Sequence, residues 1–211
     1  MIGSLPAPLD VAVDLGSGPG RTVPALATRA RTVLAVDVSA GMLGLRRHAH
    51  PAVLADGHSL PMRASSVDAC CLRMSVHYFS LPALREQLRR VLKPAGWLLI
   101  VSIFPYGPAD TAWFNERHRL KGKGGVHTPC VESLTRILRP GFEPHAASSW
   151  HAVHPVRSSM RSHPAAAGDE LLRHALGAPA AVRKLYRIAA DGHGDVTITV
   201  QWAALLFGRT P

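Results

Sequence analysis

A chain of 211 residues with 47% hydrophobic and 18% charged residues contains enough apolar material for one sizeable core. It has no uncharged apolar run of about 18 residues, and its start lacks the basic region and apolar run of a signal peptide, so we expect a cytoplasmic protein without a membrane span. Three cysteines are an odd number and the 12 histidines are scattered, so neither a disulfide framework nor a metal site is expected.

The net charge of +10 raises the question of a nucleic-acid partner. Basic residues form only pairs, such as Arg46-Arg47 and Arg89-Arg90, with no dense block and no stripe interleaved with aromatic residues. A solvated basic surface is therefore the favoured interpretation, and nucleic acid remains the less favoured partner.

The most informative stretch is VAVDLGSGPG, residues 11–20, where a short apolar strand leads directly into three glycines spaced two apart. Glycine permits positive φ and close approach of a ligand to bare backbone, so this pattern predicts a ligand-binding turn. Residues 21–30 have the composition of a helix start, and the first N–H groups of that helix would face the ligand. The dinucleotide pattern G-x-G-x-x-G would need glycine where Arg21 stands, so the spacing differs from that fingerprint.

Two acids follow the next two predicted strands. The strand over residues 32–36 ends in Asp37, where one carboxylate can accept from both hydroxyls of a ribose, whichever nucleoside carries it. The strand that begins at residue 52 ends in Asp56, and Gly57 opens a proline-containing loop. The alternatives are that Asp37 caps the helix expected after Ser39 and that Asp56 holds its own loop.

Apolar patterning places the remaining elements. It predicts a strand over 67–72, a helix over 84–92, a turn at 93–96 and a strand over 97–104. Further elements are a helix over 131–138, a strand over 143–156, a helix over 164–190 broken near 177–179, and a last strand over 195–208.

The segments VAVDLGSGPG, AVD, ADGHSLPM, SVDACCLRMSVHY and RRVLKPAGWLLI occur in this order and together resemble the class I S-adenosylmethionine-dependent methyltransferases. The resemblance covers about residues 10–104 and is strongest to the small-molecule branch that includes the ubiquinone and menaquinone biosynthesis methyltransferases. It implies an α/β, Rossmann-like three-layer sandwich with a seven-stranded, mostly parallel sheet and an antiparallel last strand. We expect residues 1–211 to form a single methyltransferase domain. Ala95 replaces a glycine that the family prefers, a change expected to be tolerated.

The resemblance also implies how S-adenosylmethionine is bound. Asp14 would order the turn and the cofactor's amino group, and Asp37 would accept the ribose hydroxyls. Asp56 would accept from the adenine amine, the Gly57 N–H would donate to a ring nitrogen, and Arg73 would contact the methionine end. The complete set of expected cofactor-binding residues is Asp14, Gly16, Gly18, Gly20, Asp37, Asp56, Gly57 and Arg73.

Methyl transfer requires few catalytic groups, because a sulfonium methyl group is already a good electrophile. Positioning of the nucleophile supplies much of the catalysis. If a base is needed, His77 is the first candidate, since it lies just beyond the fourth strand and imidazole titrates near neutral pH. The alternative is that His77 packs or orients. Tyr78 would share the role, and His118 and His127 are second-rank candidates.

The resemblance loses specificity after Phe104. Residues 105–130 combine aromatic, glycine, proline and basic residues, as expected of a lid that binds the acceptor. The alternative is a basic surface helix followed by a flexible loop. The basic residues that would favour a carboxylate or phosphate on the acceptor are Arg117, Arg119, Lys121 and Lys123.

We therefore expect methyl transfer to an O or N atom of a small anionic or phenolic acceptor in natural-product or quinone-like biosynthesis, although fold alone does not fix the acceptor. The sequence Leu72-Arg73-Met74-Ser75 lacks the Asn/Asp-Pro-Pro-aromatic motif typical of base-amine methylation. An RNA or protein methyltransferase and a non-catalytic cofactor-binding subunit remain alternatives. About ten residues precede the first strand, whereas members of the family usually carry an extra helix or two there. We therefore expect a homodimer mate, a partner subunit or a large substrate to cover the open N-terminal side.

Overall fold

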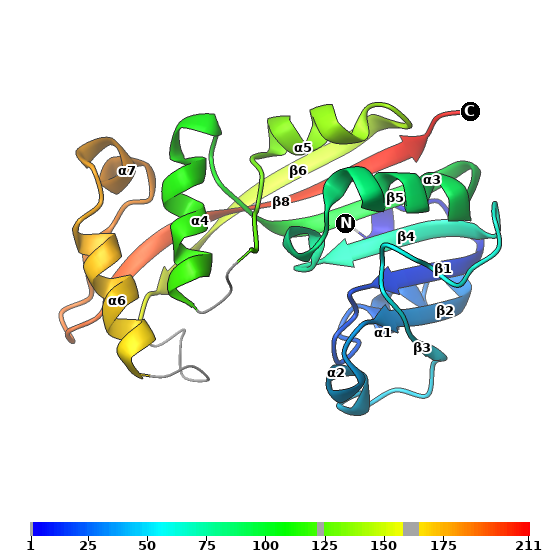
Figure 1. The fold of residues 1–211 in the computed structure, drawn as a ribbon, viewed down its shortest axis with the longest axis horizontal. Helices are drawn as coiled ribbons and strands as arrows, with labels where there is room; N and C mark the ends of the chain where they lie inside the picture. The colour runs from blue at the N-terminus through cyan, green and yellow to red at the C-terminus, as the bar shows by residue number, and fades with distance from the viewer. Residues whose placement is uncertain (1, 122–124, 158–164) are drawn as a thin grey trace. The chain divides into compact units, whose positions relative to one another are not determined.

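The computed structural model describes residues 2–121, 125–157 and 165–211 (Figure 1). The chain forms two compact units. Unit 1 consists of Met1–Ser102, Leu134–Ser148 and Ala203–Pro211, and unit 2 consists of Ile103–Ser133 and Ser149–Trp202. No helix in these described ranges is long and apolar enough to cross a membrane.

Unit 1 is built around a parallel sheet. Its elements are the short 3₁₀ turn η1 (Ile2–Ser4), β1 (Leu9–Leu15), α1 (Val23–Leu26), β2 (Ala30–Asp37), α2 (Ala40–Gly44), β3 (Ala52–Leu54), β4 (Val67–Arg73), η2 (Val76–Tyr78), α3 (Leu81–Val91), most of β5 (Leu92–Phe104) and most of α5 (Val131–Leu138). The pairs β2–β3, β1–β2, β1–β4 and β4–β5 are all parallel. The carboxyl ends of β1 to β4 therefore meet at one edge, where ligands of open α/β sheets bind.

The complete sheet has the strand order β3-β2-β1-β4-β5-β8-β6, and the two-residue β7 (Ala189–Ala190) pairs antiparallel with β8 (Val196–Arg209). The arrow of β8 runs against that of β4 (Figure 1). The predicted mostly parallel Rossmann-like sheet with an antiparallel last strand is confirmed, and β7 is an eighth strand that the sequence analysis did not include.

Helix α3 packs within unit 1 through apolar residues at helical spacing. Its four buried residues, Leu81, Leu84, Leu88 and Val91, recur at helical spacing on one face. Burial of each of these side chains contributes about 2 kcal/mol to the free energy of unfolding. On the same helix Arg90 donates to the carbonyls of Leu60 and Met62, both at 2.6 Å, so α3 also anchors the loop that follows Asp56.

The helix predicted to start within residues 21–30 is α1, which spans only Val23–Leu26. The N–H groups of Thr28 and Arg29 bond three residues back, to Ala25 and Leu26, which tightens the end of the turn. The chain then enters β2 at Ala30, where Leu9 N donates to Arg29 O at 2.9 Å. Strand pairing therefore overrides the helical composition of this segment.

The predicted turn at 93–96 is an irregular insertion within β5. Leu92 pairs with Val67 and Trp97 pairs with Ala69, so four residues bulge out on β5 where the partner strand supplies one. Ala95 adopts φ +60°, the left-handed region that favours glycine. This conformation explains the glycine preferred by the family at that position.

Unit 2 contains η3 (Pro108–Asp110), α4 (Thr111–Leu120), α6 (Ala165–Leu176), α7 (Ala180–Leu185), β7, and parts of β6 (Phe142–Pro155) and β8. Its core is aromatic: the ring of Tyr186, fully buried, lies 5.0 Å from that of Tyr106 and 4.6 Å from that of Trp113. Buried Asp110 accepts hydrogen bonds from the Tyr186 hydroxyl and from two backbone N–H groups. Residues 105–121 and 125–130 of the predicted lid belong to this unit.

Candidate functional site

A pocket of about 600 Å³ lies in unit 1 at the carboxyl ends of β1 to β4. This volume suits a ligand of small-molecule size. Six of the eight expected cofactor-binding residues line it, namely Gly16, Gly18, Asp37, Asp56, Gly57 and Arg73. The other two, Asp14 and Gly20, do not line the pocket but belong to β1 and to its glycine-rich loop.

The glycine-rich loop depends on glycine for two physical reasons. Gly16 and Gly20 adopt φ +67° and +75°, which residues with a side chain rarely adopt. A Cβ on Gly16 would also lie 2.5 Å from the Cβ of Ser75, and one on Gly20 would lie 1.9 Å from His48 Nε2. The loop is tied to β2, because Gly16 N and Ser17 N donate to Val36 O at 2.8 and 3.0 Å.

Asp37 holds the same loop with its carboxylate. Oδ2 accepts from Gly18 N at 2.7 Å, and Oδ1 accepts from Ser39 N at 2.9 Å. The cap of α2 is Ser39, whose Oγ accepts from Met42 N at 3.2 Å. Asp37 thus orders the glycine-rich loop from the end of β2, and its carboxylate borders the pocket.

Asp14 is buried beneath this loop, with 1% of its surface exposed. Burial raises the pKa of its carboxyl to about 7; nearby Arg73 acts in the opposite direction and Asp37 adds to the rise. Within the described residues Oδ2 has no hydrogen-bond partner. A buried carboxylate oxygen left in this state calls for a donor from a ligand or a water, and an ammonium group matches its charge.

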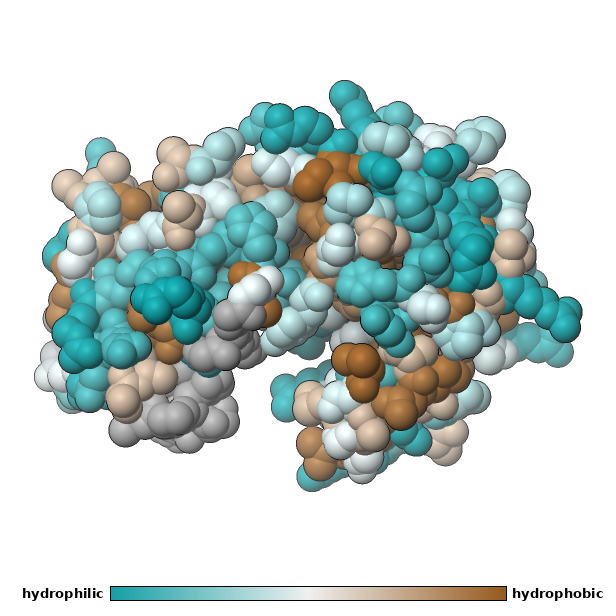
Figure 2. Space-filling view, viewed as in Figure 1, coloured by the Kyte–Doolittle hydropathy of each residue, from teal (hydrophilic) through white to brown (hydrophobic). Residues whose placement is uncertain are grey.

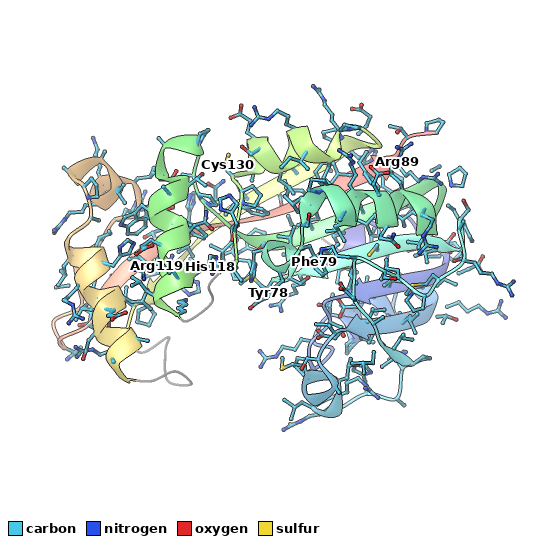
Figure 3. All side chains as sticks on the ribbon, viewed as in Figure 1. Tyr78, Phe79, Arg89, His118, Arg119 and Cys130 are labelled. Atoms are coloured by element: carbon cyan, nitrogen blue, oxygen red, sulfur yellow. The ribbon has the colours of Figure 1, made fainter. Side chains whose placement is uncertain are left out.

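Asp56 and Gly57 form the loop after β3. Asp56 Oδ1 accepts from both the backbone N and the Nδ1 of His58, each at 2.9 Å, which supports the alternative that this acid holds its own loop. The hydrogen bonds with His58 lower the pKa of Asp56, despite the opposing effect of desolvation. The ring of Phe79 lies over Gly57, where a Cβ would come within 2.4 Å of it. Figure 3 labels Phe79 beside Tyr78, in the segment between β4 and α3.

The structure also brings to the pocket apolar residues that the sequence analysis did not single out. Val38 follows the acid of β2 with 73% of its surface exposed, and Met42 on α2 lies next to Gly18. Figure 2 shows hydrophobic residues exposed on the part of unit 1 that carries α2 and β3. The signal available in the sequence was an apolar residue directly after the strand-end acid, where a turn is otherwise polar.

His77 lies in η2 and is buried, outside the pocket lining. Its ring centroid is 4.3 Å from that of Tyr78, which is 51% exposed and does line the pocket. Tyr78 is therefore the titratable side chain of this pair that reaches the pocket, and His77 as a base stays a prediction. His118 and His127 belong to unit 2, where His118 Nε2 lies 3.0 Å from Thr128 Oγ1. Lys123 lies outside the described residues.

Comparisons with known proteins agree with this geometry. Residues 13–100 match the family described as methyltransferase domain, and this stretch lies within unit 1. Residues 13–100 therefore match a methyltransferase domain, and the fold that contains them is the Rossmann-like fold of methyltransferases. The YcgJ protein of Bacillus subtilis superposes with a TM-score of 0.87 at 19% identity, over 100% of this chain and 96% of that one.

Two relatives align in sequence with this methyltransferase domain. The biotin biosynthesis bifunctional protein BioHC of Cellvibrio japonicus is 39% identical over 108 residues, 48% of this chain and 22% of that protein. The demethylmenaquinone methyltransferase of Corynebacterium kroppenstedtii is 36% identical over 98 residues, 45% of this chain and 42% of that protein. The chain thus matches less than half the length of each of these curated relatives. The predicted match to a methyltransferase domain and the predicted fold are confirmed. A geranyl diphosphate methyltransferase that superposes with a TM-score of 0.62 at 17% identity was solved in complex with S-adenosylmethionine.

Proposed function

We propose that this protein transfers the methyl group of S-adenosylmethionine to an O or N atom of a small-molecule acceptor. The observation that carries the proposal is the convergence of six expected cofactor residues on one pocket. They come from the loop after β1, the end of β2, the loop after β3 and the end of β4. Such convergence at the carboxyl edge of a parallel sheet is how this fold class binds nucleoside cofactors.

The polar groups divide the pocket into a methionine end and an adenosine end. At the methionine end, the buried Oδ2 of Asp14 would accept from the cofactor's ammonium, and the exposed guanidinium of Arg73 would pair with its carboxylate. The Coulomb interaction between Asp14 and Arg73 supports a shared subsite of opposite charges. At the adenosine end, Asp37 would accept from the ribose, and Asp56 with the Gly57 N–H would bind the adenine edge.

The acceptor side of the proposal rests on two features. The names of two relatives, from biotin and demethylmenaquinone chemistry, support a small molecule. Tyr78 is exposed at the pocket and in ring contact with His77. It would take a proton from a hydroxyl or amine nucleophile either as the phenolate or by passing its own hydroxyl proton to the His77 imidazole in the same step. The basic residues of α4 belong to unit 2, where Arg119 pairs with Glu116 and Arg117 lies over the ring of Phe114, so the preference for an anionic acceptor stays a prediction from the sequence.

Methyl transfer is tested by following S-adenosylhomocysteine release from S-adenosylmethionine against a panel of phenols, aromatic carboxylates, phosphates, and RNA. The expected result is turnover with a phenolic or anionic small molecule, with a similar rate at low and moderate salt. Salt-sensitive turnover with RNA alone would replace the proposed acceptor class by a macromolecule. Cofactor binding without turnover on any acceptor would favour the non-catalytic subunit. The Tyr78→Phe and His77→Ala variants then separate the two base candidates. Removal of the residue that acts as the base is expected to abolish the acid limb of the pH–rate profile.

A further inference from the structure

The imidazole of His58 connects two loops that line the cofactor pocket. Its Nδ1 lies 2.9 Å from Asp56 Oδ1, and its Nε2 lies 3.0 Å from the backbone N of Ser80. A backbone N–H only donates and an ionised carboxylate only accepts. The network therefore assigns one neutral tautomer, in which Nδ1 carries the proton and Nε2 is the acceptor. Each ring nitrogen is satisfied, and each bond leads to a different loop.

The bond to Ser80 also fixes the residue before it. The ring of Phe79 packs edge-on against His58, with centroids 5.5 Å apart and an interplanar angle of 70°. The same ring lies directly over Gly57 and approaches Gly16, where a Cβ would meet it at 2.4 and 3.8 Å. Gly16, Gly57, His58 and Phe79 all line the pocket. His58 thus holds an aromatic wall of the pocket as well as the acid beside it.

The bond to Asp56 determines which of its oxygens remains for a ligand. Both bonds from His58, one from the backbone N and one from Nδ1, reach Oδ1. Among the described residues Oδ2 has no hydrogen-bond partner, and the side chain is 58% exposed, so without the imidazole the carboxylate would be held by the backbone N–H of residue 58 alone. An exposed pair of this kind contributes little to stability, less than about 1 kcal/mol. Its effect is to restrict the carboxylate before a ligand arrives.

We propose that His58 is a positioning residue that holds Oδ2 of Asp56 and the ring of Phe79 in place for the adenine part of the cofactor. The inference rests on the proposed function, because it takes the Asp56 loop as the adenine end of the pocket. His58 itself does not touch the reacting atoms in this account. It acts through Asp56 on one side and through the backbone of Ser80 on the other.

The first test measures calorimetric dissociation constants for S-adenosylhomocysteine and 5′-methylthioadenosine, which share the adenosine but not the amino-acid part. His58→Ala is expected to raise both constants by the same factor, about tenfold. His58→Gln keeps one donor and one acceptor and is expected to recover most of the affinity. Arg73→Gln is expected to weaken S-adenosylhomocysteine only. His193→Ala, at an exposed histidine of unit 2, is the matched control and leaves both constants unchanged.

The second test removes the backbone donor. Ser80 has φ −66°, which proline adopts, Phe79 before it is extended, and the Ser80 hydroxyl makes no helix-cap bond. Ser80→Pro is therefore expected to weaken both ligands in the wild-type background. In the His58→Ala background it is expected to add nothing, since both changes break the same bond.

Each outcome decides the proposal. Equal losses for the two ligands, recovery in His58→Gln and non-additivity with Ser80→Pro support it. Unchanged constants in His58→Ala at an unchanged melting temperature overturn it, as does a loss confined to S-adenosylhomocysteine. If wild-type protein binds neither ligand, the cofactor site of the proposed function fails, and the inference fails with it. A fall in melting temperature without a change in affinity reduces His58 to a purely structural role.

Discussion

The loops of unit 1 and the helices of unit 2 use their chemically distinctive residues in opposite ways. In unit 1 the glycines and strand-end acids border an open pocket, and a buried carboxylate oxygen of Asp14 has no partner among the described residues. In unit 2 the distinctive aromatic residues contact one another, with Tyr186 fully buried and Phe114 4% exposed. The two buried acids differ, because Asp110 in unit 2 is satisfied by three hydrogen bonds whereas Asp14 Oδ2 in unit 1 has no partner among the described residues. An unsatisfied acid oxygen next to a pocket indicates where a ligand completes the structure.

Two aromatic residues of the predicted lid segment contribute to the core of unit 2. Phe114 belongs to that core, and Trp113 stacks on His174 at 4.9 Å and packs against the same cluster. Asp110, within the same segment, is occupied by the Tyr186 hydroxyl and backbone N–H groups. Part of this segment therefore stabilises unit 2, and any acceptor contact falls to its other side chains.

The largest expected effect comes from a side chain placed in the glycine-rich loop. Gly16→Ala must hold φ +67° with its Cβ 2.5 Å from Ser75 Cβ, so the loop moves and S-adenosylhomocysteine binding falls below calorimetric detection. The matched control is Gly107→Ala in unit 2, where a Cβ meets nothing within 4 Å and φ is extended. Retention of micromolar binding by Gly16→Ala would mean that the ligand does not use this loop.

The second effect is a pH dependence from Asp14. Its carboxyl has a pKa of about 7 in the folded protein and 3.8 as its ordinary value, so the folded state binds more protons between these pH values. The free energy of unfolding is therefore expected to fall as pH rises from about 4 to about 7, by up to about 4 kcal/mol, and then to level off.

Urea unfolding across pH 5 to 8 measures this dependence. Asp14→Asn is expected to flatten it, and Asp10→Asn, at the exposed start of the same strand, is expected to leave it in place. A wild-type stability that rises through this window would contradict the burial argument for Asp14.

The third effect separates the two units. Tyr186→Phe removes the hydroxyl that donates to buried Asp110 and is expected to lower the free energy of unfolding by about 2 kcal/mol. S-adenosylhomocysteine affinity is expected to stay constant, because the cofactor pocket is lined by unit 1 alone. The control Tyr78→Phe, at an exposed phenol, should leave stability unchanged. A loss of affinity in Tyr186→Phe would show that the pocket depends on the core of unit 2.

The smallest effect is a gain. Ala95→Gly is expected to raise the free energy of unfolding by about 0.5 kcal/mol, because relief of the left-handed backbone exceeds the entropy cost of glycine. Gly96→Ala is the opposing control, since its Cβ would lie 2.8 Å from Lys93 O. Denaturant midpoints of the two variants should move in opposite directions, and a destabilised Ala95→Gly would contradict the conformational explanation.

The sequence predicted the pocket side of the fold well because its signals are local. The acids and glycines lie at the ends of strands or just beyond them, and parallel pairing brings these ends to one edge of the sheet. The length of α1 was missed because pairing of β2 from Ala30 overrides helix propensity. The exposure of Tyr78 and the burial of His77 depend on the direction of a three-residue turn, which spacing alone cannot predict.

Two further features could not be predicted from the sequence: the hydrogen bonds that His58 makes to two loops, and the aromatic core of unit 2. Ser80 is 22 residues from His58 and Asp110 is 76 residues from Tyr186, and no pattern along the chain relates these partners. They meet only once the packing is known. The sequence therefore predicts which side chains lie at the pocket, and the structure shows which of them already have hydrogen-bond partners within the protein.

The most direct test of the account is calorimetric titration of the purified protein with S-adenosylmethionine, S-adenosylhomocysteine and NAD. Asp37→Ala is compared with Asp191→Ala, because Asp191 in unit 2 also accepts two backbone N–H bonds, at 2.8 and 3.0 Å, without bordering the pocket. The account predicts micromolar binding of the first two ligands, absence of NAD binding, loss of affinity in Asp37→Ala and wild-type affinity in Asp191→Ala. Binding that survives Asp37→Ala, or that equally accepts NAD, would contradict the assignment of this pocket to S-adenosylmethionine.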